Sequence, residues 1–268
     1  IQIYYALNLN SFKSEKEKDK IILKYQTDKK KLIIIDYLFI LPFVDVFMSS
    51  HFYSKASKFT KKINIPRGVG KWFIPPKNYF KNFDIHFLTG PLHKEQILDS
   101  ISIYKIKKKI DFFEIGFPKI DDLYNKIYSH NEILNKLKLD ENKKTILFSP
   151  AWDPGMLLSD FGIDCAKSIL ERYENFNLIV KLHPSSLVSS KHEQFKIYTH
   201  GIDWRKEFSK LESYKNFKFY EASNSNEVLA VSDIMITDVS SISYEYLVQK
   251  KPVFFYDSPK FFDREINI

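Results

Sequence analysis

The stretch Ser232–Asp257 constrains the fold more than any other part of this chain, because a strand, a helix and a second strand follow one another within it. Its apolar run Ile234–Ile236, bounded by aspartates, is typical of a buried strand in a parallel sheet. A turn with Ser240 and Ser241 comes next, and one of these serines is placed to N-cap the helix. The run Val253–Tyr256 predicts the next buried strand. The stretch therefore indicates a βαβ unit, whose helix N-terminus suits a phosphate.

The rest of the C-terminal half continues this alternation. Strands are predicted at Thr145–Phe148, Phe176–Leu182 and Phe217–Tyr220, and helices at Ile163–Tyr173 and Asn226–Val231. Alternating strands and helices predict a doubly wound parallel sheet. Such a sheet binds ligands outside the carboxyl ends of its strands, so the residues that follow each strand are the candidates for a binding site.

The N-terminal half carries a second, less clear set of patterns. Apolar runs suit strands at Leu32–Ile35, Val44–Met48, Ile85–Leu88 and Phe112–Ile115, and helices are predicted at Pro91–Ile103 and Asp122–Leu137. At 268 residues the chain is long enough for two domains. A polar, turn-prone segment at 140–144 places the boundary there. We expect one Rossmann-like domain at 1–140 and a second at 141–268.

Composition excludes several classes of protein. Cys165 is the sole cysteine, so neither a disulfide framework nor a cysteine-based zinc site is expected, and a reducing cytoplasm fits. No apolar window is long enough for a transmembrane helix. The chain starts at Ile1 without a signal-peptide pattern, which suggests an excised or incomplete chain.

The formal net charge of +8 has two explanations. It can result from a bias in the amino-acid composition of the source organism's proteins, or it can serve to bind an anionic membrane surface or a phosphate-bearing substrate. Nucleic acid fits poorly as a partner, because the basic residues are scattered and no zinc-finger or RNP signature is found. We therefore expect a cytoplasmic protein, with peripheral association with the inner face of the cell membrane as an option.

Polar residues follow three strands of the C-terminal half, at Ser149–Asp153, Lys181–Ser186 and Thr237–Ser241. Because the carboxyl ends of parallel strands share one edge of a sheet, we expect these clusters to meet there. Lysine, histidine and serine side chains supply the cationic and hydroxyl donors that bind a diphosphate. The predicted binding residues at this edge are Ser149, Trp152, Lys181, Ser185, Thr237, Asp238, Ser240, Ser241 and Glu245.

Four residues in or beside these clusters also have an ordinary structural explanation. His183 can satisfy backbone groups before its proline, or donate to a phosphate oxygen as charge builds on a leaving group. Trp152 can offer its face to a base or belong to the core. Asp238 can hold a ribose, position the serines or only cap a helix. Glu245 lies four residues after Ser241 on the same side, where a solvated glutamate would be ordinary.

Residues 65–71 place two glycines and two basic residues at a strand end in the N-terminal half. Gly68 and Gly70, with Arg67 and Lys71, form a flexible acceptor-side loop that can approach a phosphate or an acceptor, although a plain turn fits as well. No grouping of His, Asp and Glu has metal-ligand spacing, so no metal or other cofactor is expected.

Together these residues resemble the CDP-glycerol glycerophosphotransferase family, the polymerases and primases of teichoic acid and related capsules. The resemblance covers about residues 44–257, strongly in the C-terminal half and thinly before residue 110. The stretches that carry it are Gly116–Asp121, Thr145–Trp152, Lys181–Pro184, Ile236–Ser241 with Glu245, and Lys251–Tyr256.

The resemblance implies an α/β fold of two Rossmann-like domains facing each other across a cleft, the GT-B glycosyltransferase architecture, which uses no bound metal. Residues 1–140 would form the acceptor-side domain, and residues 141–268 the nucleotide-donor-binding domain, whose predicted binding residues at the strand ends would bind the donor. Such relatives transfer glycerol phosphate from CDP-glycerol to a hydroxyl of a growing chain and release CMP. His183, Ser240 and Ser241 would then hold the donor's diphosphate, with Glu245 close by. The implied partners are a nucleotide-activated donor and a lipid-linked or polymeric polyol-phosphate or glycan acceptor.

One departure from the family pattern concerns Arg67. The family usually places a histidine, the candidate base, before the glycine of its N-terminal loop, and Arg67 occupies that place here. Arginine is a poor base at neutral pH but a good clamp for phosphate. Arg67 and His183 are the candidate catalytic residues of a glycerophosphotransferase-like enzyme. The alternatives are a GT-B glycosyltransferase that uses a nucleotide-sugar in capsule or glycan synthesis, and a non-catalytic binding module.

Overall fold

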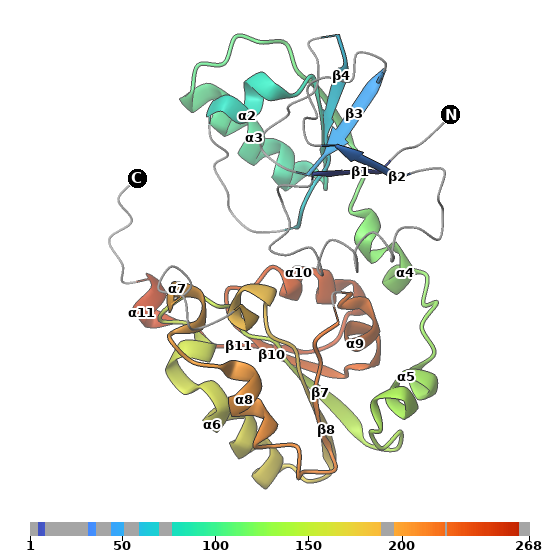
Figure 1. The fold of residues 1–268 in the computed structure, drawn as a ribbon, viewed down its shortest axis with the longest axis vertical. Helices are drawn as coiled ribbons and strands as arrows, with labels where there is room; N and C mark the ends of the chain where they lie inside the picture. The colour runs from blue at the N-terminus through green and yellow to red at the C-terminus, as the bar shows by residue number, and fades with distance from the viewer. Residues whose placement is uncertain are drawn as a thin grey trace. The chain divides into compact units, whose positions relative to one another are not determined.

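A computed structural model describes residues 5–8, 32–35, 44–50, 59–69, 77–188, 196–222 and 224–262 of the chain. The chain divides into two compact units, one formed by Ile1–Arg67 and Trp72–Gly116 and the other by Gly68–Lys71 and Phe117–Ile268. In Figure 1 the first unit runs from blue to green and the second from green to red. Within the described residues, no helix is long and apolar enough to cross a membrane.

The first unit contains a parallel sheet in the order β3-β4-β5-β6. Its strands are β3 (Val46–Ser49), β4 (Lys61–Asn64), β5 (Ile85–Leu88) and β6 (Asp111–Glu114). Helices α2 (Lys77–Asn82) and α3 (Pro91–Ile103) supply Phe80 and Ile97 to its core. A separate parallel pair joins β1 (Tyr5–Asn8) to β2 (Leu32–Ile35). Strand β4 is not among the predicted strands, because its sequence contains a single apolar residue, Ile63.

The second unit contains a parallel sheet in the order β11-β10-β7-β8-β9. Its strands are β7 (Lys144–Phe148), β8 (Phe176–Val180), β9 (Phe217–Phe219), β10 (Ile234–Thr237) and β11 (Val253–Phe255). Every neighbouring pair is parallel, which confirms the predicted strand directions. Short helices of this unit include η5 (Pro184–Leu187), α7 (Lys196–Thr199), α10 (Ile242–Tyr246), η7 (Leu247–Gln249) and α11 (Pro259–Phe262).

Longer helices cover both faces of the second sheet, because alternate residues of each strand point to opposite sides. On one face Ile146 and Phe148 pack with α6 (Leu157–Arg172) and α8 (Trp204–Ser209). On the other face Leu147 and Ile179 pack with α5 (His130–Leu137) and α9 (Asn226–Val231). Figure 1 shows α6 and α8 on the opposite side of the sheet from α5 and α9. The predicted doubly wound α/β sheet is confirmed.

The segment after Gly116 differs from the prediction, which placed one helix at Asp122–Leu137 and a domain boundary near residue 140. It forms η4 (Pro118–Ile120), α4 (Asp121–Tyr124) and α5. Lys126 adopts a left-handed backbone with φ 54°, which a helix interior does not allow. Leu123 and Leu134 are buried in the core on the α5 and α9 face of the second sheet. The residues from Phe117 onward therefore pack with the second unit, although the polar turn lies further along the chain.

Strand β11 corrects the prediction of a buried strand at Val253–Tyr256. It lies at one end of the strand order, with β10 as its neighbour. Phe254 and Phe255 are 60% and 59% exposed. A short apolar run does not distinguish a central strand from an edge strand, which explains the error.

Candidate functional site

Two predicted site residues join the carboxyl ends of three strands in the second sheet. The Thr237 hydroxyl donates to the Ser149 carbonyl at 2.7 Å, and the Ser149 hydroxyl donates to the Lys181 carbonyl at 2.9 Å. Thr237 and Ser149 are both buried. These bonds tie β10 to β7 and β7 to β8, so the hydroxyls hold the strand ends in register. Contact of Ser149 or Thr237 with a donor stays a prediction.

Asp238 fixes the loop between β7 and α6. Its fully buried carboxylate accepts hydrogen bonds from the backbone N–H of Ala151 at 2.8 Å and of Leu157 at 2.9 Å. Burial raises the pKa of Asp238 to about 6, although the two N–H donors oppose the rise. Leu157 is the first residue of α6, so Asp238 caps that helix from a neighbouring strand rather than the helix that follows it.

His183 and Trp152 lie close together at this edge of the sheet. Nδ1 of the exposed His183 ring accepts from the backbone N–H of Ser185 at 3.1 Å, so the neutral ring carries its proton on Nε2, as a donor. The ring centroids of Trp152 and His183 are 6.4 Å apart. Trp152 is half-buried and meets Tyr198 edge-on at 4.7 Å. The segments that follow β7 and β8 thus bring the indole of Trp152 and the imidazole of His183 close together.

The serine turn after β10 leads into α10. Ser241 is the N-cap residue of this helix, as predicted, but its side chain makes no capping hydrogen bond. Ser240 and Ser241 are half-buried, and neither hydroxyl has a hydrogen-bond partner within the described part of the chain. The Ser240 carbonyl accepts from the Ser243 hydroxyl at 2.6 Å, which stabilises the turn. Contact of either hydroxyl with a ligand stays a prediction.

Lys181 and Glu245 are both buried, and each is bonded to a different neighbour. The Lys181 ammonium donates to the Ala222 carbonyl at 3.1 Å and lies 5.8 Å from the Tyr220 ring centre. Burial lowers the pKa of Lys181. The Glu245 carboxylate accepts from the Lys119 ammonium, with both N–O distances at 2.7 Å.

Lys119 is not among the site residues predicted from the sequence. Its charge partner lies 126 positions further along the chain, so no local pattern links the two residues. The one available signal was its place in the Gly116–Asp121 segment that resembles the family.

The acceptor-side loop follows β4 along the chain, and of its described residues Arg67 belongs to the first unit and Gly68 to the second. Arg67 and Gly68 are exposed there, whereas Gly70 and Lys71 lie outside the described residues. No group of three or more His, Cys, Asp or Glu side chains that could hold a metal ion occurs in the part of the chain that the structure describes. Roles for Arg67 and the glycines stay predictions.

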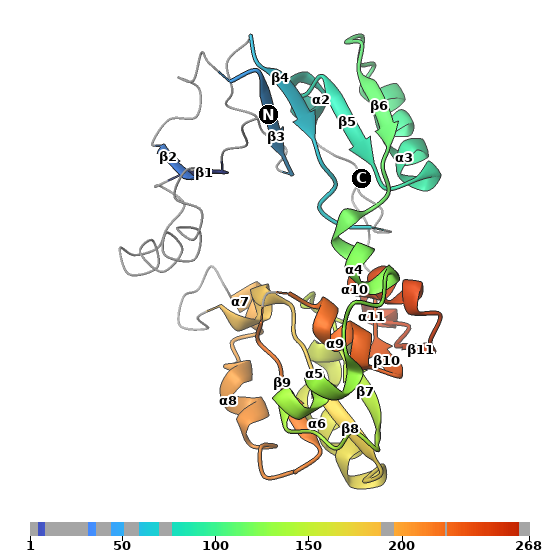
Figure 2. The same cartoon turned by 90° about the vertical axis from the view of Figure 1, so that its right-hand side faces the viewer.

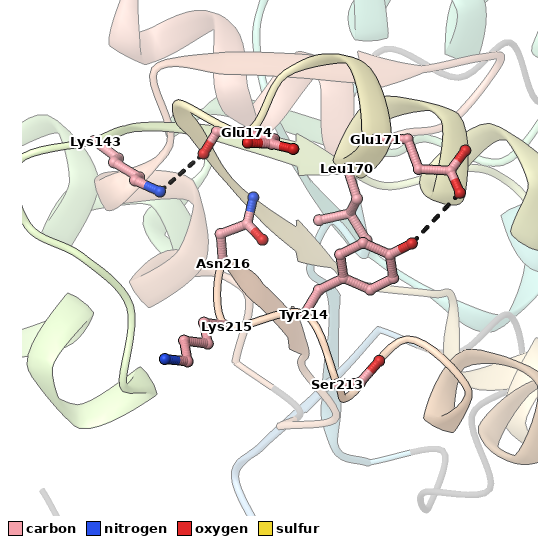
Figure 3. A pocket seen from close by; sticks show the side chains of 8 residues that line it. All are labelled: Lys143, Leu170, Glu171, Glu174, Ser213, Tyr214, Lys215 and Asn216. Carbon is pink, nitrogen blue, oxygen red and sulfur yellow. Dashed lines mark hydrogen bonds between the residues drawn. The ribbon is translucent and has the colours of Figure 1, made fainter.

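A hollow of about 540 Å³ opens at the opposite edge of the second sheet, before the strands begin. It is lined by Lys143, Leu170, Glu171, Glu174, Ser213, Tyr214, Lys215 and Asn216 (Figure 3). The Lys143 ammonium donates to the Glu174 carbonyl at 2.8 Å, which closes a loop. None of the predicted site residues lines this hollow.

The fold and the site define a class of protein. It is an α/β protein whose parallel sheet gathers hydroxyl, imidazole and indole groups at the carboxyl edge of its strands, where nucleotides bind. A family model described as CDP-glycerol:poly(glycerophosphate) glycerophosphotransferase matches residues 80–260. This match covers more than half of the chain, and the chain belongs to that family. The predicted family is confirmed.

Curated relatives are similar over part of their length. The teichoic acid poly(glycerol phosphate) polymerase of Staphylococcus epidermidis is 28% identical over 162 residues, which are 55% of this chain and 20% of the relative. The polymerase of the same name from Bacillus spizizenii is 30% identical over 162 residues, 58% of this chain and 36% of the relative. The ribitol-phosphate polymerase TarL of Staphylococcus aureus is 29% identical over 57% of this chain and 26% of its own length. The chain thus spans well under half of each relative.

Solved structures of a wall teichoic acid polymerase, TagF, share the fold. One superposes with a TM-score of 0.62 at 17% identity, over 99% of this chain and 72% of TagF. Another, soaked with CDPG, has a TM-score of 0.62 at 18% identity, over 91% of this chain and 67% of TagF. At such identity the likeness shows the fold, and it confirms the predicted GT-B class. That the two domains face each other across a cleft stays a prediction.

Proposed function

We propose that this chain carries out the transfer of glycerol phosphate, or a related polyol phosphate, from a CDP-activated donor to a hydroxyl of a growing cell-surface polymer, with release of CMP. One observation carries the proposal. His183, Ser240, Ser241 and Trp152 stand at the carboxyl edge of one parallel sheet, and their chemistry matches a diphosphate and a base. Family membership and the names of the relatives, glycerol-phosphate and ribitol-phosphate polymerases, support the same reaction.

In the proposed reaction the acceptor hydroxyl oxygen attacks the phosphorus that bears the glycerol. A new P–O bond forms, the P–O bond to CMP breaks, and CMP leaves with the bridging oxygen while a base takes the acceptor proton. The Nε2–H of His183 and the hydroxyls of Ser240 and Ser241 would bind the diphosphate and stabilise the charge that builds on CMP.

Arg67 would bind phosphate rather than take the proton, because a guanidinium stays protonated at neutral pH. The base would then be another group. We also propose that the reaction needs no bound metal, since lysine, histidine and hydroxyl donors supply the phosphate contacts. A lipid-linked or polymeric acceptor, and peripheral association with the inner face of the membrane, belong to the same proposal.

The test is CMP release from CDP-glycerol, CDP-ribitol and a panel of UDP-sugars, with a lipid-linked polyol-phosphate acceptor present and with and without a chelator. We expect CMP from one CDP-polyol, unaffected by the chelator. Folded protein that releases no CMP from any CDP donor but turns over a UDP-sugar would overturn the proposal in favour of a nucleotide-sugar transferase.

A further inference from the structure

The starting point is the ion pair between Lys119 and Glu245. The Lys119 Nζ lies 2.7 Å from each carboxylate oxygen, yet the Glu245 side chain is 5% exposed and that of Lys119 43%. The pair therefore turns its negative end inward and its positive end toward solvent. Burying a carboxylate is costly even when it is paired, so a pair that serves stability alone gains little from this arrangement.

Two further hydrogen bonds from neighbouring residues hold both members of the pair. The Asn226 side-chain amide donates to the Lys119 carbonyl at 2.7 Å, and the Ser225 hydroxyl donates to Glu245 at 3.4 Å. Both come from the start of α9, and α4, α9 and α10 lie together in Figures 1 and 2. The Lys119 backbone and ammonium are thus both fixed. A lysine that is already ordered loses less side-chain entropy when it binds a ligand.

The pair lies beside the serine turn. Glu245 follows Ser241 by four residues on α10, which puts both on one side of that helix. The charges of Lys119 and Glu245 both act on the pKa of Lys181, Lys119 lowering it and Glu245 raising it, so the three groups share one electrostatic neighbourhood. Two ammonium groups against one carboxylate leave this neighbourhood positive. Of the two, Lys181 is buried and Lys119 faces solvent.

We propose that Lys119 is a donor-binding residue, whose ammonium contacts the diphosphate of the CDP-activated donor while Glu245 and Asn226 hold it in position. The inference rests on the proposed function of this edge. Among the described residues, the Lys119 ammonium donates to the two carboxylate oxygens of Glu245. An ammonium has three N–H donors, so one remains for a phosphate oxygen.

The decisive variant is Lys119→Gln/Glu245→Gln. It removes both charges together, so no unpaired charge is left buried, and the two amides can still hydrogen-bond. Calorimetric titration then compares CDP with cytidine, which lacks the phosphates. We expect the Kd for CDP to rise about tenfold, the size of one lost hydrogen bond to a charged group, while the Kd for cytidine stays within about twofold.

Lys136 and Glu227 provide a matched control. They form a Lys–Glu pair at 2.8 Å that joins α5 to α9 in the same unit. Lys136→Gln/Glu227→Gln should leave the Kd for CDP unchanged. Lys119→Arg keeps the cation and should bind CDP within about threefold of the natural chain. Lys119→Gln alone is the second variant if the double one does not fold, since an amide still donates to Glu245.

The possible failures are distinguishable. Folded Lys119→Gln/Glu245→Gln protein that binds CDP as tightly as the natural chain would show that the pair is structural and overturn the inference alone. An equal loss for CDP and cytidine would also overturn it, because the effect would not come from the phosphates. A natural chain that binds neither CDP nor cytidine would overturn the proposed function and this inference with it.

Discussion

The two edges of the second sheet differ in the polar side chains that they present to solvent. At the carboxyl edge, Thr237, Ser149 and Asp238 are buried, and each bonds the backbone of another strand or loop. At the amino edge, Asn177 and Thr145 are also buried and bonded to each other. The residues that line the hollow of Figure 3 are exposed or half-buried, apart from Leu170, and the bond from Lys143 to the Glu174 carbonyl joins two loops. Buried polar atoms cost free energy unless they are bonded. The carboxyl edge combines such buried, bonded groups with the hydroxyls of Ser240 and Ser241 and the ring of His183, so it is the candidate functional edge.

Loss of the Asp238 carboxylate should produce the largest difference between the edges. Asp238→Ala leaves the N–H groups of Ala151 and Leu157 buried without an acceptor, which should lower the free energy of unfolding by about 2–5 kcal/mol. Glu171→Ala at the amino edge should change it by less than about 0.5 kcal/mol. Urea unfolding of both variants measures this. Equal midpoints for the two would contradict the contrast.

Activity should separate the edges next. His183→Ala should lower CMP release about 100-fold, because it removes a donor to the phosphate on which charge develops. The exposed ring contributes little to packing, so the melting temperature should change by only a few degrees. Lys143→Ala at the amino edge is the control and should keep full turnover. A large fall in melting temperature with normal turnover would make His183 a structural residue.

The pH dependence of stability should follow Asp238. Its pKa is raised from 3.8 to about 6 in the folded chain, so its favourable contribution is complete below about pH 4 and is lost as pH rises through about 6. The loss amounts to about 3 kcal/mol. Asp238→Asn cannot titrate, so the difference in unfolding midpoint between it and the natural chain should change between pH 4 and pH 7. A constant difference would contradict the raised pKa.

The smallest effect concerns the aromatic face. Trp152→Leu should weaken CMP binding about tenfold, because stacking of a base on an aromatic ring is worth about 1–3 kcal/mol. Tyr214→Leu at the amino edge should leave CMP binding unchanged. Fluorescence or calorimetric titration of CMP measures both. Unaltered binding to the Trp152 variant would assign that ring to the packing against Tyr198.

Sequence reasoning located the carboxyl edge because apolar runs and the polar residues that follow them are local patterns. Thr145–Phe148 and Ile234–Ile236 identify strands, and parallel topology brings their ends together. The same reasoning could not find the bond from Asp238 to Leu157 or the pair of Lys119 with Glu245. These contacts join residues 81 and 126 positions apart, and nothing in their local sequence distinguishes a partner.

The errors in the fold have a similar origin. The predicted helix at Asp122–Leu137 is helical in α4 and α5, but the break between them lets both Leu123 and Leu134 pack into the core of the second sheet. The exposure of Phe254 and Phe255 depends on which strand occupies the end of the order. Both features are set by tertiary packing rather than by local pattern.

The most direct test of the account is the crystal structure of the chain with bound CDP-glycerol. We expect the diphosphate within hydrogen-bonding distance of Ser240, Ser241 and His183, with the cytosine against Trp152. Ligand density at the amino-edge hollow, or a carboxyl edge left empty at saturating CDP-glycerol, would contradict the claim that this edge of the second sheet binds the donor.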